Sequence, residues 1–382
     1  MSGGVDSSVA AALLKKQGFD VLGVFMKFSP SPQNRCCSPE SQERARLVAQ
    51  KLGMPFYVFN FEKEFKKRVI DYFLREYKAG RTPNPCIVCN KEIKFGLLLE
   101  KALAMDADYI ATGHYAKISS SEKHNNFPRR GKFCSTLGLA LPTFVGNHGR
   151  SPSEKFSSED TFALHLSQGK DKEKDQSYFL WQLNQKQLRR VLFPVGNYTK
   201  KEVINLAKKF ELPVLGIPES QEICFVPNTI NDFLAKHIKP KPGPIHICAL
   251  PQSAQAVHSA GVHRHRGLAF YTIGQRKGIG LSGGPYWVLG KDLKKNILVV
   301  TKKEKDLYQK ELTFEKPNWI FNGLSGFPLK VKAKIRYRHS AEPATLVSAK
   351  RLIFDKPQRA ITPGQSVVFY LGDELLGGGI IC

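Results

Sequence analysis

Residues 2–8 of the chain, SGGVDSS, combine residue types that suit phosphate binding, and a helical pattern follows them directly. Glycines lack a Cβ atom and let a phosphate approach the backbone, while serine hydroxyls and the N–H groups of a helix start donate hydrogen bonds to it. Asp6 could hold Mg²⁺ against the phosphates. A glycine turn with a capping serine would explain a lone SGG, but the complete segment favours a phosphate site. It is neither a Walker A loop, because no GK[ST] follows, nor GxGxxG.

A pair of cysteines, Cys86 and Cys89, lies within TPNPCIVCNK at residues 82–91. Two sulfurs three residues apart can face one point, as a metal, an iron–sulfur cluster or thiol chemistry requires. Lys91 and Lys94 would favour the thiolate of Cys89 by stabilising its negative charge. Two buried structural cysteines are the alternative, but the Pro-Asn-Pro turn favours a shaped loop.

A further cysteine, Cys224, follows a polar loop in SQEICF at residues 220–225. Taken alone it is typical of a buried structural thiol. Two weaker patterns are ATGHY at 111–115, after a strand, and KDQS at 174–177, before a helix. A surface histidine and a helix cap are the simpler interpretations of these two.

The elements that must position these residues alternate between strands and helices in the first half of the chain. Apolar spacing predicts helices over residues 9–18, 41–52, 178–191 and 200–210, and strands over residues 21–28, 56–59 and 108–111. This alternation indicates a parallel sheet covered by helices. A strand normally leads into a phosphate-binding turn, so we expect that the first strand is missing through truncation or a misassigned start codon.

Beyond Pro213 the pattern changes to short β-rich runs, apart from a helix near residues 230–237. The expected strands cover residues 270–274, 286–290, 296–300, 330–337 and 366–370, which suits small barrels. Between residues 118 and 160 a Ser-, Asn- and Gly-rich basic stretch predicts a surface insertion.

Composition indicates a polyanionic partner for a folded protein. The 382 residues suffice for two or three domains, and 58 Lys plus Arg against 33 Asp plus Glu leave a net charge of +25. No apolar run approaches the length of a membrane span, and no export leader precedes the first motif, so we expect neither a membrane span nor export. Composition leaves nucleic acid and an anionic membrane surface open as the partner. Eight cysteines without such a leader favour reactive thiols or metal ligands in reducing cytosol over a disulfide framework.

One expected strand carries cations at alternate positions. Lys332, Lys334, Arg336 and Arg338 would share one side of an extended strand and face phosphates together. A solvated face kept for solubility is the alternative.

The motifs in this order resemble the tRNA-specific 2-thiouridylase family of bacteria and mitochondria. The resemblance extends over almost the whole chain, apart from the insertion and the missing strand. It rests on SGGVDSS, CCS at residues 36–38, TPNPCIVCNKEIKFG, ATGHYA, KDQSYFLW, ESQEICFV, FYTIGQRKGIG, IRYRH and TPGQSVVFYLGDELLGGGII.

The resemblance implies roles for individual residues. Catalysis is assigned to Cys224, which carries a persulfide, and to Cys89, which resolves it through a disulfide bond. The residues implied to bind ATP are Ser2, Gly3, Gly4, Val5, Asp6, Ser7, Ser8, Met26 and Gly113. The residues implied to contact tRNA are Asn84, Pro85 and Cys86 at the target base, and His114, Lys174, Asp175, Gln176, Arg336, Tyr337 and Gln365 elsewhere.

The implied reaction activates the C2 oxygen of the wobble uridine with ATP and Mg²⁺ and then replaces it with sulfur. This order is chemically sound, because a uridine carbonyl is a poor electrophile and adenylation creates a leaving group. Many family members have aspartate where this chain has Cys86, so no carboxylate role transfers to that position. Members with the extra cysteine suggest a second mechanism, in which Cys86, Cys89 and Cys224 hold a 4Fe-4S cluster with one open iron. Both mechanisms stay open.

The implied architecture is a PP-loop α/β domain over residues 1–216, a central β-rich domain over 217–304 and a C-terminal tRNA-binding β-barrel over 305–382. The resemblance implies tRNA as the partner, and no membrane. We expect a monomer that takes its sulfur from a donor protein or a sulfide source. Two rivals remain. Another PP-loop adenylating enzyme of the amidoligase type needs neither paired cysteines nor basic barrels, and a non-catalytic RNA-binding protein needs no phosphate loop.

Overall fold

In the computed structural model the described residues are 1–28, 38–120, 163–216, 223–248, 263–320 and 326–382. They form two compact units. Unit 1 comprises Met1–Lys63, Asn90–Phe225 and Asp373–Leu375, and unit 2 comprises Glu64–Cys89, Val226–Gly372 and Leu376–Cys382. The expected insertion from residue 121 onward, the adjacent cysteines 36 and 37, and residues 217–222 before Cys224 lie outside the described residues.

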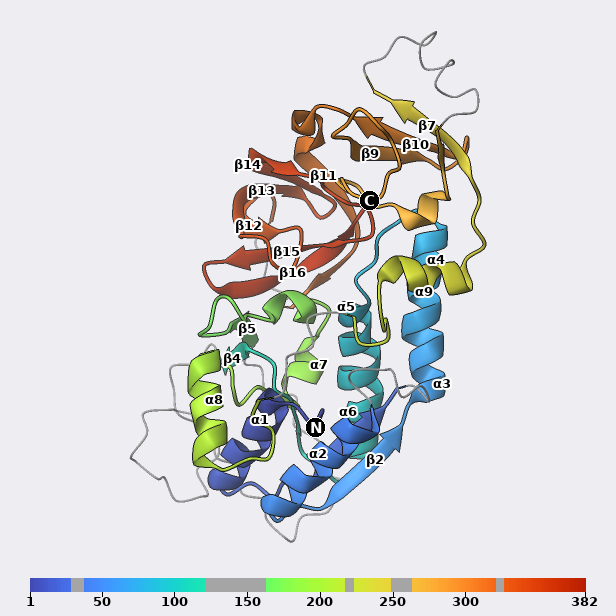
Figure 1. The fold of residues 1–382 in the computed structure, drawn as a ribbon. Coiled ribbons are helices and arrows are strands. Elements are labelled where there is room, and N and C mark those ends of the chain that lie inside the picture. The colour runs from blue at the N-terminus through green and yellow to red at the C-terminus, as the bar shows by residue number, and fades with distance from the viewer. Residues whose placement is uncertain (29–37, 121–162, 217–222, 249–262, 321–325) are drawn as a thin grey trace. The chain divides into compact units, whose positions relative to one another are not determined.

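Unit 1 alternates helices with short strands (Figure 1). Its elements are α1 (Val5–Lys16), β1 (Gly23–Lys27), α2 (Pro39–Lys51), β2 (Phe56–Asn60), η2 (Asn90–Leu97), α6 (Leu98–Leu103), β3 (Ile110–Ala111), β4 (Ala116–Ser120), β5 (Leu164–Gln168), η3 (Ser177–Leu180), α7 (Gln185–Leu188), β6 (Val191–Leu192) and α8 (Lys200–Lys209). Strands β1 and β2 pair in parallel, and so do β3 and β6. The expected parallel strands are therefore confirmed.

Local sequence explains where the helices of unit 1 begin and end. Helix α1 ends at Lys16, and Gly18 follows the C-cap residue Gln17 with a φ of 87°, which suits a residue without a Cβ atom. Helix α2 begins after Ser38, whose side chain accepts a hydrogen bond from the Ser41 amide, with proline at the next position. Helix α8 begins with a capping box between Thr199 and Glu202.

The core of unit 1 joins α1 to α8. Val9 and Leu13 of α1 pack in one buried cluster with Val203 and Ala207 of α8, and Tyr115 belongs to the same cluster. Burial of this apolar surface fixes the start of α1 relative to the loop that contains Tyr115.

Unit 2 is helical at first and then β-rich (Figure 1). Its elements are η1 (Lys66–Ile70), α4 (Asp71–Lys78), α5 (Pro85–Cys89), α9 (Ile230–His237), β7 (Gly243–Ile247), β8 (Arg264–His265), η4 (Leu268–Phe270), β9 (Trp287–Asp292), β10 (Ile297–Thr301), η5 (Glu304–Leu307), β11 (Tyr308–Trp319), β12 (Leu329–Lys334), β13 (Glu342–Ser348), β14 (Arg351–Arg359), β15 (Ser366–Leu371) and most of β16 (Glu374–Ile381). Helix α3 (Glu62–Phe65) contains the boundary between the units.

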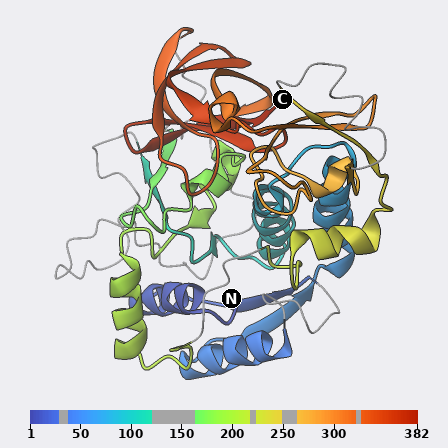
Figure 2. The same ribbon diagram turned by 45° about the horizontal axis from the view of Figure 1, so that its top comes forward.

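Strands β11 to β16 form a closed barrel (Figure 2), in the order β11, β14, β13, β12, β15 and β16, with β16 pairing back to β11. Phe314, Phe354 and Phe369 fill its interior. A second, four-stranded sheet has the order β8, β7, β10 and β9. A parallel α/β domain followed by β-rich domains is the expected fold class, and it is confirmed.

The structure corrects three local expectations. Residues 178–191 contain the 3₁₀ turn η3 and the short helix α7 in place of one helix, and residues 270–274 form no strand. Strand β12 ends at Lys334, and the chain turns immediately afterwards. Arg336 and Arg338 therefore do not continue a cationic strand face, because a face with a period of two exists only in extended backbone.

Candidate active site

The phosphate-like loop lies where the sequence predicts it, at the start of α1. Gly4 is the N-cap residue in an extended conformation, and no side chain caps the helix. The Ser8 hydroxyl donates to the Gly4 carbonyl at 2.9 Å, the Ser7 hydroxyl donates to the same oxygen at 3.2 Å, and the Ser2 amide donates to Ser7 Oγ at 3.1 Å. The serines therefore stabilise the loop, and the amides of the first turn of α1 have no side-chain cap and can meet an anion.

The three glycines of the predicted nucleotide site have different roles. A Cβ atom on Gly3 would lie 2.2 Å from the Ser41 carbonyl oxygen, and one on Gly113 would lie 2.7 Å from the backbone of Asp6. These two glycines thus let α2 and the loop after β3 approach the phosphate loop. A Cβ atom on Gly4 would have only Ser2 Oγ nearby, at 3.5 Å, so Gly4 is the glycine whose face is open.

Asp6 accepts two hydrogen bonds at the same oxygen. The Tyr115 hydroxyl and the Lys200 amine each donate to Asp6 Oδ1 at 2.7 Å. Lys200 is the first residue of α8, so the fold supplies a cation at the phosphate loop that no sequence pattern indicates. We expect Lys200 to oppose the negative charge of a bound phosphate.

The KDQS segment supports the turn that contains Tyr115. Gln176 Oε1 accepts from the Tyr115 amide at 3.2 Å, and the Gln176 amide donates to the Tyr115 carbonyl at 2.9 Å. Asp175 is buried, and its carboxylate accepts from the Gly169 amide and from the amide and hydroxyl of Ser177. The amide of Lys174 donates to Asp171 Oδ1.

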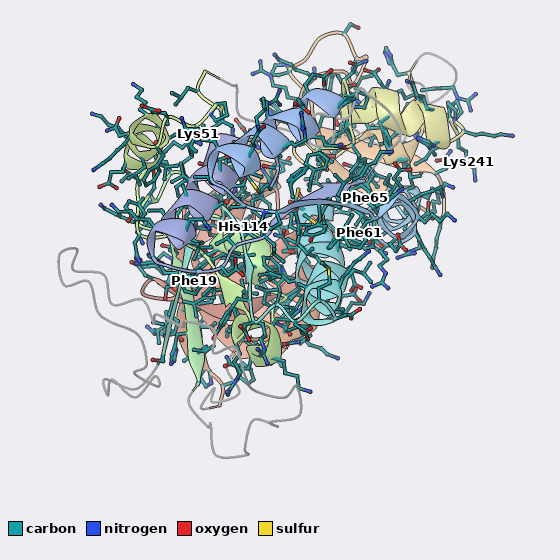
Figure 3. All side chains as sticks on the ribbon, turned by 90° about the horizontal axis from the view of Figure 1, so that it is seen from below. Phe19, Lys51, Phe61, Phe65, His114 and Lys241 are labelled. Atoms are coloured by element: carbon teal, nitrogen blue, oxygen red, sulfur yellow. The ribbon has the colours of Figure 1, made fainter. Side chains whose placement is uncertain are left out.

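His114 is only 8 % exposed, so the surface position expected for a loop histidine is wrong. Its Nδ1 lies 2.6 Å from the Thr112 hydroxyl, and its ring contacts Phe95 and Phe193. Figure 3 shows it in the interior. Burial, together with the charge of Lys94, lowers the pKa of His114 well below its usual value of 6.5. The ring is therefore neutral near pH 7.

Met26 and Gly113 lie near the carboxyl ends of strands β1 and β3. Met26 is partly buried on β1 and pairs with Phe59 of β2, and Gly113 follows β3 by two residues. Ligands of parallel α/β sheets bind at this edge. Both positions are compatible with the predicted nucleotide site.

Cys86 and Cys89 lie on helix α5 and not in the shaped loop that the Pro-Asn-Pro turn predicts, because the turn starts a helix. Asn84 Oδ1 accepts a hydrogen bond from the Cys86 amide at 3.2 Å, and Pro85 is the first helical residue. Cys89 is buried, and the helix continues through the π-helix η2 into α6. A π-helix of eight residues is unusual and is often found at functional sites.

Cys224 lies in a turn before the buried Phe225 and is partly exposed. It belongs to unit 1, whereas Cys86 and Cys89 end a segment of unit 2. Across the described ranges, no group of three or more His, Cys, Asp or Glu side chains could hold a metal ion.

The C-terminal candidates make contacts within unit 2. The Arg336 guanidinium donates to the Ala360 carbonyl and to Thr362 Oγ1, and Tyr337 lies partly buried in the turn after β12. Gln365 Nε2 donates to the Thr82 carbonyl at 2.7 Å.

The expectation that Lys334 faces solvent is wrong. Its side chain is buried, and its amine lies 5.4 Å from the centroid of the Tyr370 ring.

The loop before α1 fits the phosphates of ATP on three observations. The helix start lacks a side-chain cap, the face of Gly4 is open, and Lys200 lies beside Asp6. Asp6 is the residue of this loop that could also contact Mg²⁺. No helix in the described ranges is both long and apolar enough to cross a lipid bilayer.

Three family models match successive parts of the chain. The model described as a tRNA methyl transferase HUP domain matches residues 1–133 and 146–228, a tRNA methyl transferase PRC-barrel domain matches 231–302, and an aminomethyltransferase beta-barrel domain matches 309–381. The fold and the loop thus define a HUP-type nucleotide-binding protein with two β-rich domains.

Individual relatives specify the family further. The chain is 43 % identical to the tRNA-specific 2-thiouridylase MnmA of Halothermothrix orenii, over all of this chain and 97 % of the relative. It is 42 % identical to MnmA 2 of Thermoanaerobacter pseudethanolicus and 41 % identical to MnmA of Clostridioides difficile, each over all of this chain and 96 % of the relative. The chain belongs to the tRNA-specific 2-thiouridylase family.

Proposed function

We propose that this chain is an ATP-dependent tRNA 2-thiouridylase, which replaces the C2 oxygen of the wobble uridine with sulfur. The observation that carries the proposal is its similarity, over the full length of the chain, to proteins named tRNA-specific 2-thiouridylases. The family models are described by methyl transfer instead, which moves a different group. A phosphate loop and two cysteine segments suit ATP-dependent sulfur transfer better, because methyl transfer requires neither.

In the first step, the uridine O2 attacks the α-phosphate of ATP, and pyrophosphate leaves. Residues 2–8, with Met26 and Gly113, bind the nucleotide. The amides of the first turn of α1 and the amine of Lys200 offset the phosphate charge. Bound Mg²⁺ would supply further positive charge, with Asp6 as its protein ligand.

In the second step, Cys224 carries a persulfide whose outer sulfur attacks C2. The bond from C2 to the adenylated oxygen breaks, and AMP leaves with the electron pair. The Cys89 thiolate then attacks Cys224 Sγ, which breaks the persulfide bond, forms a Cys89–Cys224 disulfide and leaves the outer sulfur on the uridine. A thiol reductant from outside the chain must restore both cysteines.

The remaining predicted residues would bind the tRNA. Asn84, Pro85 and Cys86 would meet the target base, and residues 174–176, Arg336 and Tyr337 would contact other parts of the tRNA. The resemblance implies the same for Gln365, but its side chain donates to the Thr82 carbonyl, which supports a role within the protein instead. His114 is neutral, so its contact would be a hydrogen bond and not an ion pair. The net charge of +25 supports an RNA partner.

The third thiol, Cys86, supports an alternative source of sulfur. A 4Fe-4S cluster held by Cys86, Cys89 and Cys224 would supply an open iron site for sulfide. The described residues form no three-ligand metal group, so we derive no step through such a cluster. We propose that the enzyme acts in the cytosol, because this chemistry needs reduced thiols and tRNA, and that it acts as a monomer. A donor protein would supply the persulfide sulfur, whereas sulfide would serve only the cluster mechanism.

A tRNA-dependent exchange of pyrophosphate into ATP tests the activity. The proposal predicts exchange only when tRNA is present, and 2-thiouridine in the product by mass spectrometry. Exchange without tRNA would support an amidoligase-type enzyme, and tRNA binding without exchange would support a non-catalytic RNA-binding protein.

Cysteine variants test the mechanism. Cys89→Ser and Cys224→Ser should each abolish thiolation while tRNA affinity in a gel shift stays within about twofold. Cys86→Ala should retain substantial activity if the persulfide mechanism operates. Iron-dependent absorption under anaerobic conditions that disappears in Cys86→Ala, together with activity, would replace the persulfide mechanism with the cluster.

A further inference from the structure

The segment Gly80–Thr82 leads into the helix that carries Cys86 and Cys89, and its backbone is held from several directions within unit 2. The Lys291 amine on β9 donates to the Gly80 carbonyl at 2.8 Å. Gln365 Nε2 donates to the Thr82 carbonyl at 2.7 Å, and the Thr82 amide donates to the Pro363 carbonyl at 2.9 Å. These contacts come from stretches that match two different β-domain models.

Side-chain packing cannot hold this segment on all sides, because it borders a pocket of about 600 Å³. Lys291, Leu307 and Thr362 line the same pocket. Beside an open volume, hydrogen bonds to the backbone help to fix the path of a chain. Polar groups at a pocket wall also hold their geometry better than exposed ones, since less water competes for them.

Gly364 supplies an independent observation on the same segment. Its φ is +90°, and a Cβ atom there would lie 2.8 Å from Arg81 Cβ and 2.9 Å from the Thr82 amide nitrogen. The turn that carries Gln365 therefore approaches the segment as closely as a residue without a side chain allows. Arg81 itself is fixed by a double hydrogen bond to the buried carboxylate of Glu76.

Burying the amine of Lys291 at this position is energetically unfavourable. Burial lowers the pKa of Lys291 to about 8. A methionine would fill similar space without the cost of burying an amine, so the stabilising role of the lysine lies in its bond to the Gly80 carbonyl.

We propose that Lys291 and Gln365 are positioning residues, which hold Gly80 and Thr82 from two β-rich domains and thereby fix the start of the helix that carries Cys86 and Cys89. The proposal rests on the proposed function for the role of the cysteines. It assigns Gln365 an action on the protein backbone, which differs from the tRNA contact that the family resemblance implies.

The test uses the full chain without tRNA and measures alkylation of individual cysteines by peptide mass spectrometry. Lys291→Met and Gln365→Leu remove the two donors separately. Each should raise the alkylation rate of Cys86 and of the buried Cys89 about fivefold relative to the exposed Cys248, because the helix start opens more often. Lys294→Met, an exposed lysine just after β9, is the matched control and should leave these rates unchanged.

A second readout separates positioning from RNA binding. Both variants should lower the single-turnover thiolation rate at saturating tRNA about tenfold while the tRNA dissociation constant stays within twofold. Alkylation rates of Cys86 and Cys89 that stay within twofold in both variants would overturn the proposal, and so would a loss in Gln365→Leu that is confined to tRNA affinity. If the wild-type chain showed no thiolation while the two variants still showed the expected rise in cysteine alkylation, the proposed function would be refuted and the positioning role would stand.

Discussion

The amine of Lys200 donates a hydrogen bond to Asp6 Oδ1 at 2.7 Å, across 194 positions of sequence. Both side chains are mostly buried, at 16 % and 31 % exposure. The contact places a cation from α8 at the first turn of α1, where the helix amides lack a side-chain cap. A site that attracts anions thus depends on the packing of α8 against α1.

Lys200→Met should weaken ATP binding at least tenfold, about 1.4 kcal/mol, because the site loses the positive charge beside Asp6. Isothermal titration calorimetry with ATP measures this. Lys201→Met, an exposed neighbour on the same helix, is the control and should bind ATP normally. Equal affinities in the two variants would exclude Lys200 from the phosphate site.

Gly4→Ala should abolish ATP binding without loss of stability. The added methyl group meets only Ser2 Oγ at 3.5 Å in the ligand-free fold, but it occupies the open face at which a phosphate would approach. Gly113→Ala should lower both stability and ATP affinity, since its methyl group would lie 2.7 Å from the backbone of Asp6. Thermal melting and calorimetry on the two variants give this contrast, and normal ATP affinity in Gly4→Ala would contradict the assignment.

His114 should make the protein sensitive to acid. Its pKa in the folded chain lies well below 6.5, so below pH 6.5 the unfolded state binds a proton that the folded state does not. The contribution of the neutral ring to stability is complete above pH 6.5 and falls as the pH falls. Between pH 6.5 and 5 the loss is at most about 2 kcal/mol. Urea unfolding of wild type and His114→Gln at both pH values checks this, and parallel pH dependences would refute it.

Lys334→Glu should destabilise the barrel, whereas Lys332→Glu should not. Lys334 is buried over the Tyr370 ring, so a carboxylate there should destabilise the barrel by about 2 to 4 kcal/mol. Lys332 is exposed on β12, so the charge reversal in Lys332→Glu should change the free energy of unfolding by no more than about 0.5 kcal/mol.

Of these two lysines, only Lys332 is expected to contribute to tRNA binding. Lys332→Glu should weaken tRNA binding and reduce its salt dependence by about one counterion. Gel shifts at several salt concentrations measure this. Unchanged tRNA binding in Lys332→Glu would remove β12 from the RNA surface.

The sequence supported some of these conclusions directly and misled on others for identifiable reasons. Apolar spacing placed α2, α8 and α9 within two residues of the observed bounds, because helical periodicity is a local property of the sequence. The run KVKAKIRY alternates cations with apolar residues, yet β12 stops at Lys334 because the chain turns there. Residues 178–191 have helical spacing, but tertiary contacts divide them into a 3₁₀ turn and one short helix.

By itself the sequence determined the α/β fold followed by β-rich domains, the loop before α1 and the Cys-x-x-Cys pair. Residues adjacent in the chain carry these features, and their types and spacing suffice to predict them. Only the tertiary structure decided that Lys200 lies at Asp6, that His114 is buried and neutral, and that Lys291 and Gln365 hold Gly80 and Thr82. These contacts join residues separated by up to 283 positions. Which distant side chains meet depends on how whole elements pack, and that packing is decided by the sum of many small apolar contacts and not by any short pattern.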